Sequence, residues 1–258
     1  MDTVLIKLSG NVVSEESSLD KLSDYILSLK KQGKQVVLTH GGGMQTTDLS
    51  ERLGLAVQQV AGRRFTDEQT LEVLLYIIGG KLNRNIVSFL RKHDISSVGI
   101  SGIDGGLTTS SRRAPITIDG ESMDFGLVGE IDSVDVSLAE QLLKSGFVPV
   151  IGCLTWSPEE GILNINADTF AIRISLALHV SELILLMNPP AVLDADQNPV
   201  PVLRRDDWQR GLKEGWIKDG MKPKLLTAFE ALEKGIRSVR LTSAEVLATG
   251  GGTKLVSD

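Results

Sequence analysis

Two hydrophobic patterns alternate along the chain. Short unbroken runs rich in branched apolar residues predict buried strands, and longer stretches with an apolar residue every three or four positions predict amphipathic helices. The runs that predict strands lie at residues 3–8, 35–39, 97–100, 148–152, 183–187 and 238–241. The stretches that predict helices lie at residues 17–31, 44–53, 66–78, 135–144, 168–180 and 223–234. This alternation, with right-handed crossovers, predicts a mainly parallel sheet between two layers of helices.

Local signals refine the ends of these elements. Ser17 is expected to cap the first helix, and Thr66-Asp-Glu-Gln69 matches a capping box that would start the third. Gly79-Gly80 is expected to bend that third helix. Residues 116–126 lack helical periodicity and contain Asp119-Gly120, a turn signal that predicts a surface hairpin. We find neither an internal repeat nor a flexible linker, so residues 1–258 are expected to form one α/β unit.

Composition excludes several classes of protein. The 258 residues carry 27 Lys and Arg against 33 Asp and Glu, a net charge of −6, which argues against nucleic acid as the main partner. The longest strongly apolar run, 183–187, is far shorter than the roughly 18 residues that span a bilayer, so no membrane partner is expected. Cys153 is the only cysteine, which excludes an internal disulfide and favours a reducing, cytoplasmic location. The three histidines are too scattered to predict a metal site within the protein.

The sharpest local feature is His40-Gly41-Gly42-Gly43, between a predicted strand and a predicted helix. Three glycines allow the backbone to approach a ligand closely, and the N–H groups at a helix start attract anions. Such a loop suits a phosphate group, although a tight turn that binds nothing stays open at this point. The pattern is neither the dinucleotide fingerprint nor a P-loop.

Two lysines stand in unusual positions. Lys7 lies in the apolar strand that ends at Lys7-Leu-Ser-Gly10, where burial is costly unless an anion pairs with it. An exposed strand end is the alternative. Parallel strands end at one edge of the sheet, so Lys7 and the glycine loop are expected to share a crevice. Lys224 lies in the first turn of a helix, where the helix dipole disfavours a cation. Two lysines with two glycine-rich backbone sites are what phosphoryl transfer requires.

Six segments together resemble the amino acid kinase family in their order and approximate spacing. They are Lys7-Leu-Ser-Gly10, His40-Gly-Gly-Gly43, Gly62-Arg-Arg-Phe-Thr66, Gly79-Gly-Lys-Leu-Asn83, Asn164-Ile-Asn-Ala-Asp168 and Asp219-Gly-Met-Lys-Pro-Lys224. The resemblance covers essentially the whole chain. It implies a three-layer αβα sandwich with a central, mainly parallel sheet of about eight strands. It also implies an N-terminal lobe, about 1–170, for the acylated amino acid and dimerisation, and a C-terminal lobe, about 171–258, for ATP.

The resemblance also implies roles for the charged residues. Lys7 and Lys224 would stabilise the transferring phosphoryl group, Lys224 also contacting the nucleotide, and Asp168 would orient both lysines. A simple N-cap for the helix 168–180 is the alternative for Asp168. Arg64 would hold the substrate α-carboxylate, which its planar fork fits.

The remaining site residues contribute amides and backbone groups. Gly10, Gly42 and Gly43 would supply backbone donors around the phosphoryl group and the substrate. Asn164 would bind the main-chain-like groups of the acylated amino acid, with a turn residue as its alternative. Asn188 would adjoin the nucleotide.

The activity implied is transfer of the γ-phosphoryl group of ATP, with Mg²⁺ carried on the nucleotide, to the γ-carboxylate of N-acetyl-L-glutamate. This is the second step of arginine biosynthesis, and relatives without an N-terminal extension imply a homodimer. The chain departs from the usual family pattern at Asn188 and Ala191, which replace an acidic residue and a glycine. Two alternatives stay open. One is a kinase for another acylated acid, such as N-succinylglutamate or a carrier-linked aminoadipate, and the other is a catalytically weakened ligand-binding protein.

Overall fold

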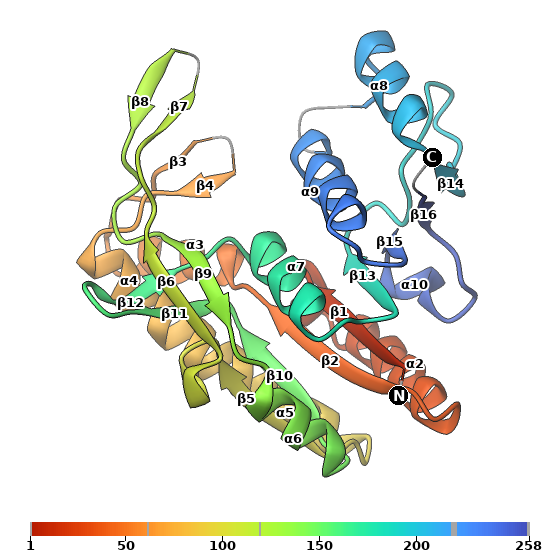
Figure 1. Cartoon of the computed structure of the whole chain (residues 1–258), viewed down its shortest axis with the longest axis horizontal. Helices are drawn as coiled ribbons and strands as arrows, with labels where there is room; N and C mark the ends of the chain where they lie inside the picture. The colour runs from red at the N-terminus through yellow and green to blue at the C-terminus, as the bar shows by residue number, and fades with distance from the viewer. Residues whose placement is uncertain (1, 61, 119, 218–220, 257–258) are drawn as a thin grey trace.

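An eight-stranded sheet forms the centre of the computed structural model, which describes residues 2–60, 62–118, 120–217 and 221–256 (Figure 1). Its strand order is β14-β16-β15-β13-β1-β2-β10-β5, and every neighbouring pair is parallel except β15 and β16. The strands are β1 (Thr3–Leu8), β2 (Gln35–His40), β5 (Ser97–Ser101), β10 (Val148–Gly152), β13 (Glu182–Leu186), β14 (Val202–Leu203), β15 (Val239–Thr242) and β16 (Thr253–Leu255). The predicted mainly parallel sheet is confirmed.

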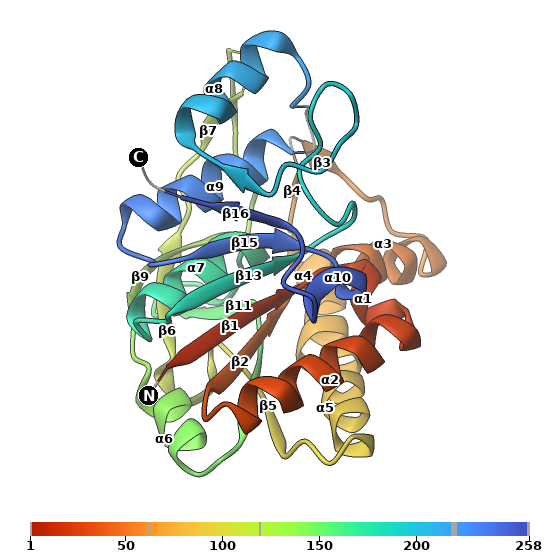
Figure 2. The ribbon, with the colours of Figure 1, turned by 90° about the vertical axis from the view of Figure 1, so that its right-hand side faces the viewer.

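Helices cover both faces of this sheet. Figures 1 and 2 show α6 (Ser137–Lys144), α7 (Ala167–Ala177) and α9 (Lys222–Glu233) on one face. The opposite face is covered by α2 (Glu16–Lys31) and α5 (Asn83–Lys92). Short helices α1 (Gly10–Ser14), α3 (Gly43–Arg52) and α10 (Ala244–Leu247) follow the ends of β1, β2 and β15, and α8 (Arg205–Glu214) follows β14. The three-layer arrangement predicted for the chain is therefore confirmed.

One long helical run contains an irregular middle. It consists of α4 (Glu68–Leu74), a π-helical segment η1 (Leu75–Leu82) and α5. Gly79 and Gly80, where a bend was expected, lie inside the π-helical turns. By length and composition alone this run, Glu68–Lys92, could cross a membrane, and half of its most apolar stretch is buried against the rest of the fold.

Two expected caps are wrong in position. Ser17 lies inside α2, which is preceded by Glu15. Asp67 caps α4 by accepting a hydrogen bond from the Thr70 N–H at 2.8 Å, so the helix starts one residue later than a cap at Thr66 would place it. Asx side chains accept such bonds readily, which explains why Asp67 displaces the neighbouring threonine.

A second, four-stranded sheet was not predicted. Its order is β12-β11-β6-β9, with β6 (Thr108–Arg112), β9 (Gly129–Val134), β11 (Leu154–Ser157) and β12 (Gly161–Asn164). Thr108, Ser110 and Thr155 are fully buried there, and the Thr155 hydroxyl lies 2.7 Å from both of the others. Mutual hydrogen bonding satisfies these buried hydroxyls, so the strands are polar in sequence yet internal.

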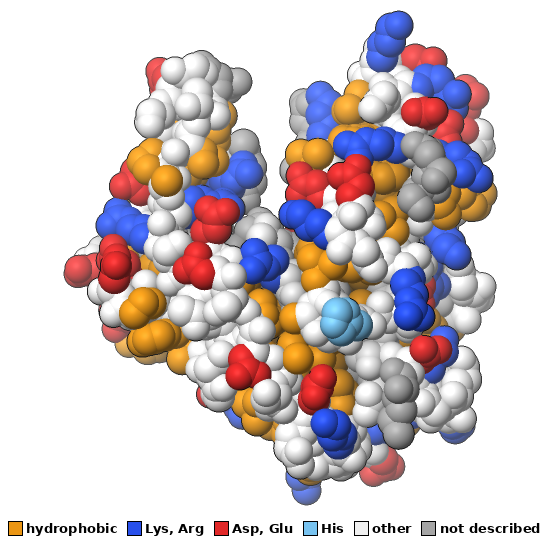
Figure 3. Space-filling view, viewed as in Figure 1, with side chains coloured by type: hydrophobic (Ala, Val, Ile, Leu, Met, Phe, Trp, Pro, Cys, Tyr) orange, Lys and Arg blue, Asp and Glu red, His pale blue; other side chains and the backbone are white. Residues whose placement is uncertain are grey.

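Two small antiparallel ribbons extend from this second sheet region. One pairs β3 (Gln59–Val60) with β4 (Arg63–Arg64), and the other pairs β7 (Ile116–Ile118) with β8 (Glu121–Met123). The second ribbon confirms the predicted hairpin, although Asp119 lies outside the described residues. In the space-filling view the molecule is hollowed between the arm that carries β7 and β8 and the mass formed by α8 and α9 (Figure 3).

Candidate active site

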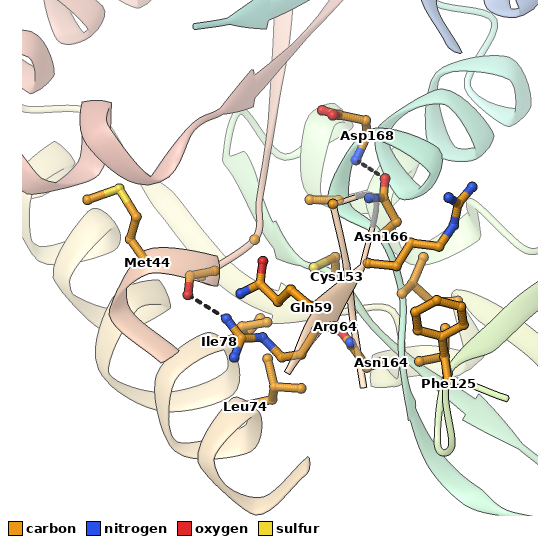
Figure 4. Close-up of a pocket in the computed structure, with 18 of the residues that line it drawn as sticks. Met44, Gln59, Arg64, Leu74, Ile78, Phe125, Cys153, Asn164, Asn166 and Asp168 are labelled. Carbon is orange, nitrogen blue, oxygen red and sulfur yellow. Dashed lines mark hydrogen bonds between the residues drawn. The ribbon is translucent and has the colours of Figure 1, made fainter. Parts of the chain in front are cut away.

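A cavity of about 390 Å³ lies at the carboxyl edge of the central sheet (Figure 4). Lys7 near the end of β1 is paired in register with Thr39, directly before His40 and the glycine loop. Lys7 and the glycines therefore line the same cavity, as the parallel arrangement predicted. Arg64, Asn164 and Asp168 line it as well.

Lys7 has the anionic partner that its position in the strand required. Its Nζ lies 2.7 Å from Oδ1 of Asp168, and the two side chains are only 11% and 22% exposed. Burial alone raises the pKa of Asp168, but the charge of Lys7, the hydrogen bond from it and the charge of Lys224 together hold that pKa below its ordinary value. Asp168 is accordingly a carboxylate at neutral pH.

A neighbouring asparagine frees Asp168 for this role. The Asn166 side chain caps α7 by accepting hydrogen bonds from the N–H groups of Asp168 at 3.0 Å and Thr169 at 3.1 Å (Figure 4). The alternative interpretation of Asp168 as the cap is therefore wrong. Because the cap lies two residues earlier, the Asp168 carboxylate projects from the first turn toward Lys7.

Lys224 approaches the same charges from α9. Burial lowers its pKa most, the positive charge of Lys7 lowers it further, and Asp168 opposes both effects. Lys7, Asp168 and Lys224, from three distant parts of the chain, thus share one electrostatic environment. Of the motif before Lys224, Asp219 and Gly220 lie outside the described residues.

A second cavity of about 390 Å³ lies beside Lys224. Its lining is mostly apolar and comprises Asn188, Pro189, Val192, Leu193, Gln197, Trp216, Ile217, Met221 and Lys224. Lys224 therefore borders this cavity while it interacts with Lys7 and Asp168 at the first. A ligand with an apolar ring at one end and negative charge at the other matches such a lining.

The glycine loop is shaped by close packing. A Cβ on Gly42 would lie 2.9 Å from Ile77 and 3.0 Å from Ile78 of η1, so any larger residue would force the loop or these isoleucines to move. Gly43 has open space around it and begins α3. Gly10 begins α1, and its carbonyl accepts a hydrogen bond from Gln45 at 3.0 Å, but Gly10 does not line either cavity.

Arg64 and Asn164 line the first cavity with partners of their own. Arg64 Nη2 donates to the Gly43 carbonyl at 2.9 Å and to the Thr47 hydroxyl at 2.7 Å, and burial lowers its pKa. Asn164 Nδ2 donates to the Thr66 hydroxyl at 3.2 Å, which leaves its oxygen as an acceptor. Both side chains are therefore oriented before any ligand enters.

Sequence reasoning missed several residues at these cavities. Asn166 and Arg113 line the first one, and Trp216 lines the second. Asn166 carried a usable signal, because an asparagine directly before an apolar-faced helix is a strong N-cap candidate. Arg113 and Trp216 lie in segments without regular periodicity, and only the tertiary structure brings them to the cavities.

Comparison with known proteins identifies the family. The model of the amino acid kinase family matches residues 2–243. The chain belongs to this family. As a member it is an enzyme of the kinase class, with ATP as a substrate.

Individual relatives support the assignment over the whole length. The acetylglutamate kinase of Anaeromyxobacter dehalogenans (strain 2CP-1) is 37% identical, with 100% of both chains covered. The acetylglutamate kinase of Methanopyrus kandleri is 35% identical, with 96% of this chain and 98% of the relative covered. The crystal structure of smu.665 from Streptococcus mutans UA159 superimposes with a TM-score of 0.81 at 23% identity, covering 100% of this chain and 99% of that one. This last likeness concerns the fold.

Proposed function

We propose that this amino acid kinase phosphorylates the γ-carboxylate of N-acetyl-L-glutamate, with Mg-ATP as the donor. Relatives named acetylglutamate kinase at 35% and 37% identity over nearly the full length support this substrate. The observation that carries the mechanism is the 2.7 Å Lys7–Asp168 pair next to Lys224, with the cavity that contains Arg64 and Asn164 on one side and the mostly apolar cavity on the other.

The proposed reaction needs no general base. The γ-carboxylate is ionised at neutral pH, so one of its oxygens attacks the γ-phosphorus directly while the bond to the bridging oxygen of ADP breaks. The products are N-acetyl-L-glutamyl 5-phosphate and ADP. Lys7 and Lys224 would stabilise the charge on the moving phosphoryl group, and Asp168 would hold the two repelling ammonium groups together.

The first cavity would bind the acylated amino acid. Arg64 would exchange its contacts with Gly43 and Thr47 for the substrate α-carboxylate. The free oxygen of Asn164 would accept the substrate amide N–H. Gly42 and Gly43, which line this cavity, would donate backbone N–H groups to the phosphoryl group or the substrate.

The second cavity would bind the nucleotide. Its apolar residues, including Pro189 and Trp216, would contact the base, and Asn188 would lie near the sugar and phosphates. In this scheme the segment of about 1–170 binds the acceptor and about 171–258 binds ATP. Mg²⁺ would enter as part of the ATP complex.

A second substrate is favoured by a specific observation. Arg63 and Arg113 also line the first cavity, and among the described residues neither guanidinium has a hydrogen-bond or ion-pair partner. Together with Arg64 they bring three positive charges to the cavity, two more than the α-carboxylate of the substrate would neutralise. An acyl group that ends in a carboxylate, as in N-succinyl-L-glutamate, would use this excess.

Substrate comparison tests these proposals together. ADP release would be measured with Mg-ATP and N-acetyl-L-glutamate, N-succinyl-L-glutamate, free glutamate or N-acetyl-L-aminoadipate, with hydroxylamine to trap the acyl phosphate. Turnover highest on N-acetyl-L-glutamate supports the main proposal. Preference for the succinyl substrate, abolished in Arg113→Gln, supports the second. No turnover on any substrate by folded protein refutes both and favours a ligand-binding role.

Three further properties complete the proposal. The enzyme would work as a homodimer, in the cytoplasm, at the second step of arginine biosynthesis. Light scattering coupled to gel filtration tests the dimer, and a hexamer or a monomer would refute it. Growth of an acetylglutamate-kinase-deficient strain without arginine, restored by this chain but not by Lys7→Met, tests the pathway.

A further inference from the structure

His40 is a buried titratable residue that the proposed mechanism does not use. It ends β2 directly before the glycine loop and is 1% exposed. Both ring nitrogens have partners: Nδ1 lies 2.8 Å from the Gly41 carbonyl, and Nε2 lies 3.0 Å from Nδ2 of the buried Asn83. A fully bonded imidazole beside the loop could determine how the loop presents its backbone.

The surroundings of Asn83 fix the direction of these bonds. Its Nδ2 also lies 3.2 Å from the Ile100 carbonyl and 3.0 Å from the Val150 carbonyl, which only accept. Its oxygen accepts a hydrogen bond from Arg84, which only donates. The carboxamide can therefore adopt only one orientation, in which its amino nitrogen faces His40 and the two carbonyls, three acceptors that share two hydrogens.

The bond to Gly41 determines the tautomer of His40, and the orientation of Asn83 agrees with it. The Gly41 carbonyl only accepts, so Nδ1 carries the proton and donates to it, and Nε2 of the neutral ring is the acceptor that faces the Asn83 amino group. Burial lowers the pKa of His40 to about 4, the bond to Gly41 opposes the shift, and Arg84 adds to it. The ring is neutral at physiological pH, so its hydrogen bonds do not change there.

The bond to Gly41 orients the next peptide N–H. The only cis peptide bond among the described residues is Asn188-Pro189, so the Gly41–Gly42 bond is trans and its C=O and N–H point in opposite directions. With the Gly41 carbonyl turned to the buried ring, the Gly42 N–H is directed away from it. Gly42 lines the first cavity, and no described residue accepts a hydrogen bond from its N–H.

We propose that His40 is a positioning residue, which holds the Gly41 carbonyl so that the Gly42 N–H faces the reacting phosphoryl group. Asn83 holds His40 in turn, and it follows η1, whose Ile77 and Ile78 pack against Gly42. The loop is thus fixed from two directions by one helix. This role rests on the proposed phosphoryl transfer.

Two amide substitutions of His40 test the hydrogen bonds of its two ring nitrogens separately. Asn at position 40 places an N–H near the former Nδ1 and can keep the bond to Gly41, whereas Gln reaches the former Nε2 and keeps only the partner Asn83. We expect His40→Asn to retain kcat within about threefold, and His40→Gln to lower kcat about 10- to 100-fold with little change in KM, because one preorganised donor is misdirected. Urea unfolding of both variants serves as the control for stability.

The outcomes separate this inference from the proposed function. An equal loss of kcat in both variants, or a greater loss in His40→Asn, overturns the positioning role. The proposed function still holds in that case if the wild-type enzyme turns over an acylated acid. No wild-type turnover on any acylated acid removes both.

The tautomer of His40 and the environment of the Gly42 amide can also be measured directly in the wild-type enzyme. Nitrogen NMR of the imidazole should show the Nδ1–H tautomer, and the Gly42 amide should shift when Mg-ADP, aluminium fluoride and N-acetyl-L-glutamate are added. The Nε2–H tautomer, or an unmoved Gly42 amide in an active enzyme, would overturn the inference.

Discussion

Replacing Asp168 by Asn should destabilise the protein in a pH-dependent manner. Asn has the shape of the protonated carboxyl group, so the variant removes the charge and little else. The 2.7 Å pair with Lys7 is 11% and 22% exposed, which places it nearer a buried pair than a surface pair. Exposed pairs contribute at most about 1 kcal/mol and loss of a buried partner costs about 3 to 5 kcal/mol, so we expect a loss of about 2 to 4 kcal/mol at pH 7.

The pH dependence follows from the direction of the shift. The pKa of Asp168 is lower in the folded than in the unfolded protein, so its charge stabilises the fold above the unfolded value of about 3.9. That contribution is lost as the pH falls through the folded pKa. The difference between wild type and Asp168→Asn should therefore be constant above about pH 5 and vanish in stronger acid.

Urea unfolding followed by circular dichroism across this pH range measures the difference. Asp48→Asn is the matched control, because Asp48 pairs with Arg52 at 3.7 Å with both side chains at least 66% exposed. It should have an unfolding midpoint close to wild type at every pH. Equal midpoints for Asp168→Asn and wild type at pH 7, or a difference that persists in strong acid, would refute the reasoning.

Three further predictions concern charged residues. Lys224→Met should lower kcat by about 100- to 1,000-fold with a small change in KM, because the charge acts on the transition state, and steady-state kinetics would reject this if KM rose instead. Arg64→Lys should raise KM for the acylated amino acid about tenfold or more and affect kcat less, since lysine cannot form the bidentate contact; an unchanged KM would remove Arg64 from substrate binding. Arg240→Met should lower the free energy of unfolding by about 2 to 4 kcal/mol, because Arg240 is 10% exposed and bonds Glu182 at 3.0 Å and the Tyr25 hydroxyl at 2.7 Å; a denaturation midpoint equal to wild type would contradict it.

The sequence was most informative where burial follows hydrophobicity. The central strands are continuous apolar runs, so β1, β2, β10 and β13 could be predicted almost to the residue. Lys7 and Asp168 are 161 positions apart, yet strand polarity predicted a shared edge for Lys7 and the glycines, and the resemblance placed Asp168 with them.

The second sheet, the π-helical turns and the shortest strands could not be predicted from the hydrophobic periodicity of the sequence, and the reasons are physical. Thr108, Ser110 and Thr155 are buried because their hydroxyls satisfy one another, a property that no single strand displays. The π-helical turns around Gly79 and the short strands β14 and β16 depend on packing against distant elements. Arg113 reaches the cavity only through the arrangement of the polar second sheet.

The position of β1 in the sheet has a consequence for how the chain folds while it is being translated. Among the strands of the central sheet β1 is translated before the others and can pair with β2 soon afterwards, but its other neighbour, β13, begins only at Glu182. Until β13 has been translated, one edge of the apolar strand β1 therefore stays open to pairing with other chains. This nascent intermediate is the species for which we expect the strongest dependence on chaperones, and a truncation that ends before β13 should aggregate rather than fold.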